Sequence, residues 1–373
     1  MIAFNSLHVS TLILFAKGLG IFLVFSHHYA RSVWLTRNLH EPLLQQWQFA
    51  VVEHKFMPLL VALSNGELFD SLMLFFAYFG YVGVHLFIVA SGIGLALGYR
   101  EDENWLKFML RRITKIIPPF WIALLFFSCI WWFIGSGHSI DVIIRKMLLI
   151  STLYEDEFLA IDSPLWFVGL IFQLYVIFPA LYKIAKKYGV VLLPILIFLS
   201  YAGRYLLSIP EVVAWNSYIA HGNFINWLAV FYAAILLGKS LRNNQQISFK
   251  KVNLVLLGFV SLAISMVALN SAIFYPFADS ALAMFIVLLS LFLFNLSSRL
   301  SRYMMLIGNV SFCIYLYHRP VVDKLLILLY KKNLSNDINL FLVYAVLFSS
   351  MIMFFNFLTS LNHPILKYAF PRG

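Results

Sequence analysis

The chain has 373 residues, of which 62% are hydrophobic, 17% aromatic and 12% charged, and its mean hydropathy is +0.87. Soluble domains carry about twice that charged fraction, and apolar runs recur along the whole length, which excludes one soluble domain with a membrane anchor. Lys and Arg outnumber Asp and Glu by 27 to 16; cytoplasmic loops of a polytopic protein explain this excess, so we expect no nucleic-acid partner.

The apolar runs predict an all-α integral membrane protein of about ten transmembrane helices, forming a single membrane domain with no soluble domain and no internal repeat. The first run lacks a basic leader and a small-residue cleavage site, so we expect it to remain as a span. The predicted spans are approximately 11–30, 70–98, 119–136, 164–184, 189–208, 223–241, 252–271, 278–297, 308–330 and 339–360.

Basic residues give the predicted orientation. Lys and Arg gather in the connections after the second, fourth, sixth and eighth spans and in the C-terminal tail, whereas acids such as Glu155-Asp156-Glu157 lie in an opposite connection. By the positive-inside rule both termini face the cytoplasm of a multi-pass protein in the cell's inner (plasma) membrane. Cys129 and Cys313 both lie in apolar runs, so we expect neither a disulfide framework nor a metal site.

The first span carries Lys17 near one end and His27-His28 near the other. Lys17 and His28 are roughly 16 Å apart along a helix axis, near half a bilayer. Ionisable groups within a span usually face a bundle interior or a wetted cavity, which predicts a site reachable from both sides. The alternative is that these side chains extend to the two headgroup layers. His27 lies about 100° round the helix from His28 and is predicted to be structural.

Two connections are longer than turns. Residues 31–67 are predicted to be amphipathic and to lie on the outer interface. Residues 103–117 form a basic amphipathic stretch that is expected to stop at Pro118-Pro119, because proline does not continue a helix. Arg111, Arg112 and Lys115 cluster within this stretch. Such a cluster suits phosphate groups, or alternatively anionic lipid at the cytoplasmic leaflet.

Polar side chains also occur within predicted spans. In the second span His85 lies deep among apolar residues, and Ser91 is suited either to close helix packing or to lining a substrate channel. Trp166 opens the fourth span at the level of an aromatic belt. Gln173 lies in the middle of that span, so we expect it to hydrogen-bond to a neighbouring helix or to a ligand.

The ninth span has one polar face, because Ser311, Tyr315 and His318 recur at intervals of four and three residues. A polar stripe within a membrane either joins helices or lines a ligand path. The spacing alone leaves both alternatives open.

Taken together, these residues resemble the acyltransferase-3 family of polytopic membrane acyltransferases, which modify sugars, lipids or glycopeptides with short acyl groups. The resemblance covers essentially the whole chain and depends on five ordered signals. These are Lys17 and His28 with ten positions between them, Gly83 to Ile93, the Arg-Arg stretch from Arg111 to Pro118, Trp166 followed by Gln173, Tyr175 and Pro179, and Ser311 to Pro320.

The chain departs from the family pattern at several positions. Lys17 replaces the more usual arginine, and His85 stands where aspartate is common. Ile171 and Phe172 occupy places where many members carry a Glu pair, so any role of those acids is absent. The extracytoplasmic esterase-like domain that is fused to some members is not found in this chain, which favours direct transfer by the membrane domain or a separate partner.

The resemblance implies transfer of an acyl group, most often acetyl, from a coenzyme A thioester to a hydroxyl of a cell-surface or lipid-linked carbohydrate. It implies no permanently bound cofactor, with acetyl-CoA or another acyl-CoA as a substrate, and membrane lipid and a glycan as partners. The alternative is a transporter or lipid-linked glycan flippase, for which inverted halves and broken helices would be expected.

The expected roles follow from the chemistry of that transfer. His28 is predicted to be catalytic, deprotonating the acceptor hydroxyl or relaying the acyl group. A basic set is predicted to hold the phosphates of the coenzyme, and a second set to orient the ester or supply hydrogen-bond donors. The first set is Lys17, Arg111, Arg112 and Lys115, and the second is Ser91, Trp166, Gln173, Tyr315 and His318.

Overall fold

A computed structural model describes most of the chain and divides it into two compact units. The described residues are 2–3, 6–36, 56–133, 135, 137–154, 157, 160–208, 222–243, 248–249, 251–270 and 277–361. Unit 1 comprises Met1–Ile13, Ile88–Lys250 and Leu361–Arg372, and unit 2 comprises Leu14–Phe87, Lys251–Ser360 and Gly373. That the chain forms a single membrane domain stays a prediction.

The described residues are almost entirely helical, as the apolar runs predict. The strands among the described residues are a pair of two-residue antiparallel strands in unit 1, β1 (Ile2–Ala3) and β2 (Ser248–Phe249). Two helices continue from one unit into the other, α1 (Ser6–Thr36) and α4 (Gly83–Gly98).

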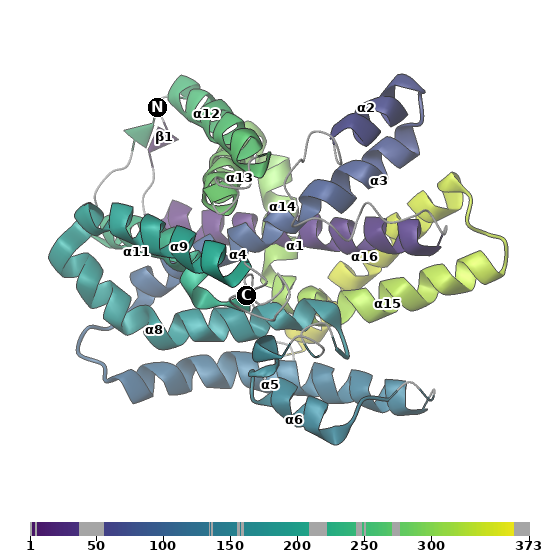
Figure 1. Cartoon of the computed structure of the whole chain (residues 1–373), viewed down its shortest axis with the longest axis horizontal. Coiled ribbons are helices and arrows are strands. Elements are labelled where there is room, and N and C mark those ends of the chain that lie inside the picture. The colour runs from purple at the N-terminus through teal and green to yellow at the C-terminus, as the bar shows by residue number, and fades with distance from the viewer. Residues whose placement is uncertain are drawn as a thin grey trace. The chain divides into compact units, whose positions relative to one another are not determined.

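In unit 1 the long helices pack along one another. Helix α5 (Trp105–Phe133) contacts α6 (Ile140–Met147) and α8 (Trp166–Tyr188), and α11 (Leu228–Arg242) contacts both α8 and α9 (Leu193–Ser208), as Figure 1 shows. Short 3₁₀ turns complete the unit and are η4 (Ser151–Leu153), η5 (Ser163–Leu165), η6 (Gly189–Leu192) and η7 (Phe224–Trp227).

Unit 2 is built from helical pairs around most of α1. The helices α2 (Met57–Ser64) and α3 (Leu68–Phe79) pack together, and the turn η3 (Gly80–Val82) joins α3 to α4. Helices α12 (Lys251–Leu269) and α13 (Ala278–Leu296) form another closely packed pair. The unit is completed by α14 (Ser298–Asn309), α15 (Ser311–Lys331) and α16 (Asp337–Ser360).

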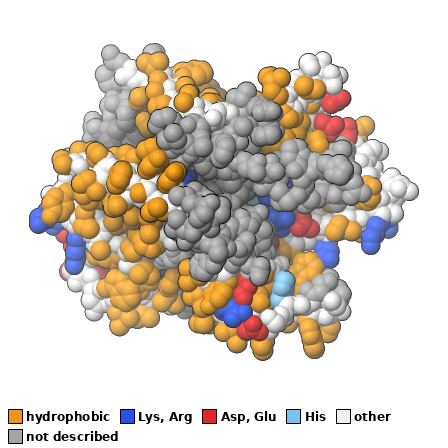
Figure 2. All heavy atoms as spheres, in the orientation of Figure 1, with side chains coloured by type: hydrophobic (Ala, Val, Ile, Leu, Met, Phe, Trp, Pro, Cys, Tyr) orange, Lys and Arg blue, Asp and Glu red, His pale blue; other side chains and the backbone are white. Residues whose placement is uncertain are grey.

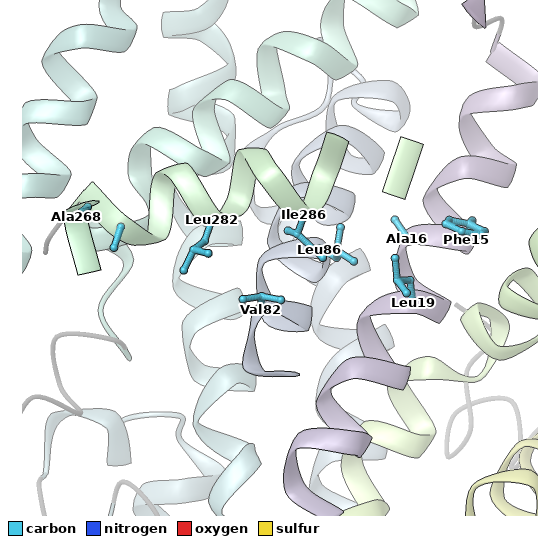
Figure 3. Close-up of a cluster of buried hydrophobic side chains, with 9 residues drawn as sticks. Phe15, Ala16, Leu19, Val82, Leu86, Ala268, Leu282 and Ile286 are labelled. Atoms are coloured by element: carbon cyan, nitrogen blue, oxygen red, sulfur yellow. The ribbon is translucent and has the colours of Figure 1, made fainter. Parts of the chain in front are cut away.

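A buried apolar cluster holds unit 2 together (Figure 3). Side chains of α1, η3, α4, α12 and α13 meet there, and their van der Waals packing stabilises the unit. Three of its members, Phe15, Ala16 and Leu19, lie on either side of Lys17 in the sequence, so the cluster fixes the position of the helix that carries Lys17 and His28. Its members are Phe15, Ala16, Leu19, Val82, Leu86, Ala268, Ala278, Leu282 and Ile286.

Helices α1 and α14 approach each other through two glycines. A methyl group at Gly18 would overlap the carbonyl oxygen of Met304, and one at Gly308 would overlap that of Leu14. The two backbones therefore touch, a close approach that small residues permit between membrane helices.

Six stretches of the described chain are long and apolar enough to cross a membrane. They are Val9–Trp34, Leu68–Gly98, Trp105–Phe133, Trp166–Leu206, Phe224–Arg242 and Asp337–Ser360. The predicted spans at 164–184 and 189–208 both overlap the single stretch Trp166–Leu206, and the apolar parts of α12 and α13 are shorter. The number of about ten spans and the cytoplasmic placement of the termini stay predictions.

The surface supports a membrane environment. Large apolar side chains remain exposed along α5, among them Leu106, Trp121, Phe126 and Phe133. Figure 2 shows hydrophobic side chains, in orange, over much of the described face. Lipid is the solvent that such a surface suits, because soluble proteins rarely expose large contiguous apolar patches.

The expected stop at Pro118-Pro119 is wrong, because α5 runs through both prolines without a break. A proline has no N–H, so two carbonyl groups of the preceding turn lose their usual helical partners. The proline φ angle is itself compatible with a helix, and membrane helices tolerate proline where neighbouring groups satisfy the freed backbone. Of the amphipathic stretch predicted at 31–67, residues 37–55 lie outside the described residues, 31–36 continue α1, and 57–64 form α2.

Candidate active site

His28 is held by an arginine from α15. Nη1 of Arg319 lies 3.1 Å from Nδ1 of His28, within unit 2. Nε of Arg319 donates to Oδ2 of Asp323 at 3.3 Å, and Ser32 Oγ donates to the other oxygen of the same carboxylate. Asp323 thus links α15 to α1 and sets the direction of the guanidinium. His28 is partly exposed, whereas its neighbour His27 is buried.

The polar face of α15 meets His28. The ring of His318 lies 5.1 Å from that of His28 and 6.1 Å from that of Tyr315, and both His318 and Tyr315 are buried. The third member of the stripe, Ser311, donates to the carbonyl of Gly308 at 2.9 Å. His318 therefore lies next to the predicted catalytic histidine and Tyr315 next to His318, while the hydroxyl of Ser311 bonds to the end of α14.

The remaining predicted polar groups of unit 2 lie on α1 and α4. Lys17 is partly buried on α1, about three turns before His28. Nδ1 of His27 donates to the carbonyl of Phe76 at 3.3 Å, a contact that fits its predicted structural role. His85 is buried in α4, with its ring 6.1 Å from that of Tyr81.

The predicted phosphate-binding residues lie on α5 in unit 1. Arg111 forms an ion pair with Glu103, whose side chain is buried. The guanidinium of Arg112 lies 5.3 Å from the ring centre of Phe108, and its Nε is buried without a hydrogen-bond partner within the described residues. Lys115 is exposed. Arg111 is thus partly neutralised by a carboxylate that the sequence interpretation did not assign.

Two predicted orienting residues of unit 1 make contacts within the bundle. Tyr175 and Ser91 bring their hydroxyl groups to 3.4 Å. Gln173 Nε2 donates to the carbonyl of Gly222 at 3.1 Å, and its Oε1 accepts from the N–H of Phe224 at 3.1 Å. Of the two alternatives for Gln173, the bond to a neighbouring segment is the one observed, and both ends of the amide are used in it.

A charged cluster lies in the connection that leads to Trp166, the first residue of α8. Arg145 donates to both carboxylate oxygens of Glu157, at 2.7 and 2.9 Å, and to Asp141 at 2.7 Å. Lys146 is fully buried beside these groups. Burial lowers the pKa of Lys146 to about 8, against the opposing attraction of Asp162 and Glu157.

The same connection has a residue in an unusual backbone conformation. Ile161 has a φ of 68°, which is unfavourable for a β-branched side chain. Its carbonyl accepts from Trp131 Nε1 at 2.9 Å, and its N–H donates to His138 Nε2 at 3.1 Å. These two bonds hold the chain in place a few residues before Trp166.

Sequence reasoning missed Arg319 and Asp323. Arg319 lies in the last of the five family motifs, Ser311 to Pro320, and Asp323 follows it. Their spacing of four residues is the signal for an ion pair on one helix face. Their contacts with His28 and Ser32 join positions 291 residues apart, which no local pattern reveals. Among the described residues, no group of three His, Cys, Asp or Glu side chains is arranged to hold a metal ion.

The comparison with protein families supplies the identity of the chain. A family model described as an acyltransferase domain (Acyl_transf_3) matches residues 13–361, nearly the whole sequence. Searches of curated proteins and of solved structures found no match. The matched range includes His28, Arg111, His318 and Arg319. The chain therefore belongs to the acyltransferase-3 family and is a membrane acyltransferase.

Proposed function

We propose that this acyltransferase moves an acetyl group from acetyl-CoA to a hydroxyl of a cell-surface or lipid-linked carbohydrate, in the inner (plasma) membrane. The observation that carries the proposal is the meeting of His28 on α1 with His318 and Arg319 on α15. Buried ionisable groups are costly in a membrane and usually have a function there. Membership of the family supplies the class of reaction.

The histidine pair supplies the chemistry that transfer to a hydroxyl requires. An alcohol is a weak nucleophile, so a base near neutral pKa must take its proton, and imidazole is suited to this. The thioester oxygen gains negative charge as the new bond forms and needs a hydrogen-bond donor. Two imidazoles 5.1 Å apart can serve both needs. His28 is the residue that we propose as catalytic.

The acyl donor requires cations, because coenzyme A carries several phosphate groups. In unit 1 the proposed ligands are Arg111, Arg112 and Lys115 on α5. The buried Nε of Arg112, which has no hydrogen-bond partner in the described structure, supports this role. Arginine also offers forked contacts to phosphate. Lys17 belongs to unit 2, and its part in donor binding stays a prediction.

The proposed orienting residues act in different ways. Ser91 and Tyr175 present a pair of hydroxyl groups, and Trp166 and Tyr315 present aromatic rings of the kind that stack on sugars and acyl chains. Gln173 acts indirectly, because both ends of its amide hold the segment before α11.

The test is transfer of label from [¹⁴C]acetyl-CoA to surface polysaccharide from a strain that lacks the gene, with the purified protein in lipid nanodiscs. We expect labelled glycan from the wild-type protein and almost none from His28→Ala. The matched control is His27→Asn, which keeps a donor towards Phe76 and should retain most of the activity.

Two results would contradict the proposal. Full activity of His28→Ala would exclude its catalytic role, and release of coenzyme A without label in the glycan would exclude a carbohydrate acceptor. NMR of the polysaccharide with and without the gene identifies the modified sugar.

A further inference from the structure

The contact with Arg319 fixes which nitrogen of His28 carries the proton. A guanidinium has N–H donors only and remains charged in proteins. Nδ1 of His28, at 3.1 Å from Nη1 of Arg319, must therefore be the acceptor. In the neutral ring the proton then lies on Nε2. His28 consequently offers an N–H donor at its free edge and no lone pair.

His318 has the opposite tautomer. Its Nδ1 lies 2.9 Å from the carbonyl oxygen of Tyr315 and 3.1 Å from that of Ile314. Carbonyl oxygens only accept, so this nitrogen carries the proton and Nε2 carries the lone pair. Nε2 is buried and has no hydrogen-bond partner within the described residues. A buried acceptor without a donor is costly, and it marks a place that a ligand hydroxyl can complete.

Both tautomers are held from outside the pair. Asp323 and Ser32 fix Arg319, and Arg319 fixes His28. The backbone of α15 fixes His318. With the two rings 5.1 Å apart, the cluster contains one imidazole donor and one imidazole acceptor, each unable to exchange its role without losing a bond.

We propose that His318 is the base that takes the proton of the acceptor hydroxyl, while His28 donates its Nε2–H to the thioester oxygen. This division of roles depends on the proposed function and differs from the expectation that His28 is the base. The hydroxyl proton passes to Nε2 of His318, and the oxygen bonds to the thioester carbon. The C–S bond then breaks, its electron pair leaves on the sulfur, and His318 returns the proton to give the free thiol.

Two substitutions separate these roles. In His318→Asn the amide nitrogen replaces Nδ1 and keeps the bonds to Ile314 and Tyr315, but the basic Nε2 is lost. In His28→Gln the amide nitrogen replaces Nε2 and keeps the donor. We expect His318→Asn to lower kcat by about 10²- to 10⁴-fold, as for loss of a general base. His28→Gln should lower it by only about tenfold, whereas His28→Ala should cost about 10²-fold or more.

The pH dependence of kcat/KM provides the second readout. Protonation of the base lowers the wild-type kcat/KM at acid pH. This acid limb should persist in His28→Gln and disappear in His318→Asn. The reverse pattern, with the limb lost in His28→Gln and kept in His318→Asn, would overturn the assignment and leave the proposed function intact.

A third readout needs no turnover. ¹⁵N NMR of the detergent-solubilised protein with labelled histidine reports the tautomer of each neutral ring, and the two substitutions assign the signals. We expect Nε2–H for His28 and Nδ1–H for His318. Nδ1–H for His28 would overturn the inference whatever the activity. A wild-type protein with the expected tautomers that consumes no acetyl-CoA with any hydroxyl acceptor would instead overturn the proposed function.

Discussion

Asp323 accepts a hydrogen bond from Nε of Arg319, one turn earlier on α15, at 3.3 Å. The same carboxylate accepts from Ser32 on α1, so the guanidinium that bonds to His28 is itself held between two helices. We predict that Asp323→Asn lowers kcat for acetyl transfer by about 10- to 100-fold, the scale of a misplaced catalytic group. The KM for acetyl-CoA should change little, because Asp323 acts on the orientation of His28 through Arg319.

Steady-state kinetics and ¹⁵N histidine NMR check this prediction together. Asp323→Glu should recover part of kcat, and Asp323→Asn should give a mixture of His28 tautomers. Lys324→Gln changes an exposed neighbour on the same helix and serves as the control. An unchanged tautomer with a large rise in KM would show that Asp323 contributes to binding instead.

Glu103 forms an ion pair with Arg111 and would compete with a phosphate group for this guanidinium. If Arg111 binds a phosphate group of acetyl-CoA, Glu103→Gln frees it and should lower the KM several-fold. Arg111→Gln should raise the KM by about tenfold, the value of one charge-assisted hydrogen bond. Both effects should weaken at high ionic strength, because Arg111 is partly exposed.

Initial rates over a range of acetyl-CoA concentrations provide the measurement. Lys107→Gln removes an exposed cation from the same helix and should leave the KM unchanged. A KM that responds equally to Lys107→Gln and Arg111→Gln would indicate a general charge effect and no defined phosphate site.

Lys146 makes stability depend on pH. Its pKa in the folded state is about 8, compared with 10.5 for an ordinary lysine. Below about pH 8 it is charged in both states, and folding bears the whole cost of burying the ammonium group. Between pH 8 and 10.5 the unfolded chain still holds a proton that the folded chain has released. The free energy of unfolding should therefore rise with pH by an amount on the order of 3 kcal/mol.

Thermal unfolding followed by tryptophan fluorescence tests this dependence. Lys146→Met should lose the rise between pH 8 and 10.5. Asp162→Asn removes a carboxylate that raises the pKa of Lys146, so the rise should begin at a lower pH. An identical rise in wild type and Lys146→Met would assign it to other groups.

The helices could be predicted from the sequence because apolar runs and turn residues are local signals. Span boundaries agree with helix ends at Trp166 and at Ser360 to within a few residues. The rule for proline failed at Pro118, since it describes isolated helices in water and neglects the packing and lipid around α5. Composition alone does not give the number of spans, because α15 carries Arg319, Asp323 and Lys324 within its length.

The candidate site was predictable only in part. Spacing within one helix led to the prediction of Lys17 and His28, and the stripe on α15 to that of Tyr315 and His318. The bond between Arg319 and His28 joins two helices far apart in the chain, so periodicity gives no sign of it. Tautomers follow only from such partners, which is why the division of roles between the histidines required the structure.

Helices α1 and α14 cross at Gly18 and Gly308, and we predict that a larger side chain at either position destabilises the protein. A methyl group at either position would overlap a backbone carbonyl of the other helix, so α1 and α14 must move apart. Gly18→Ala and Gly308→Ala should each destabilise the protein by about 1–3 kcal/mol or more, as overpacking does.

The double variant should cost less than the sum of the two single losses of stability, because one separation of the helices relieves both overlaps. In α12, Gly258→Ala is the control: apart from the nearby backbone of α12 itself, no atom of the described residues lies within 4 Å of the added methyl group. Stability should stay the same or rise by up to about 1 kcal/mol. Thermal unfolding in detergent measures all four variants, and additive losses at Gly18 and Gly308 would show that the two contacts are independent.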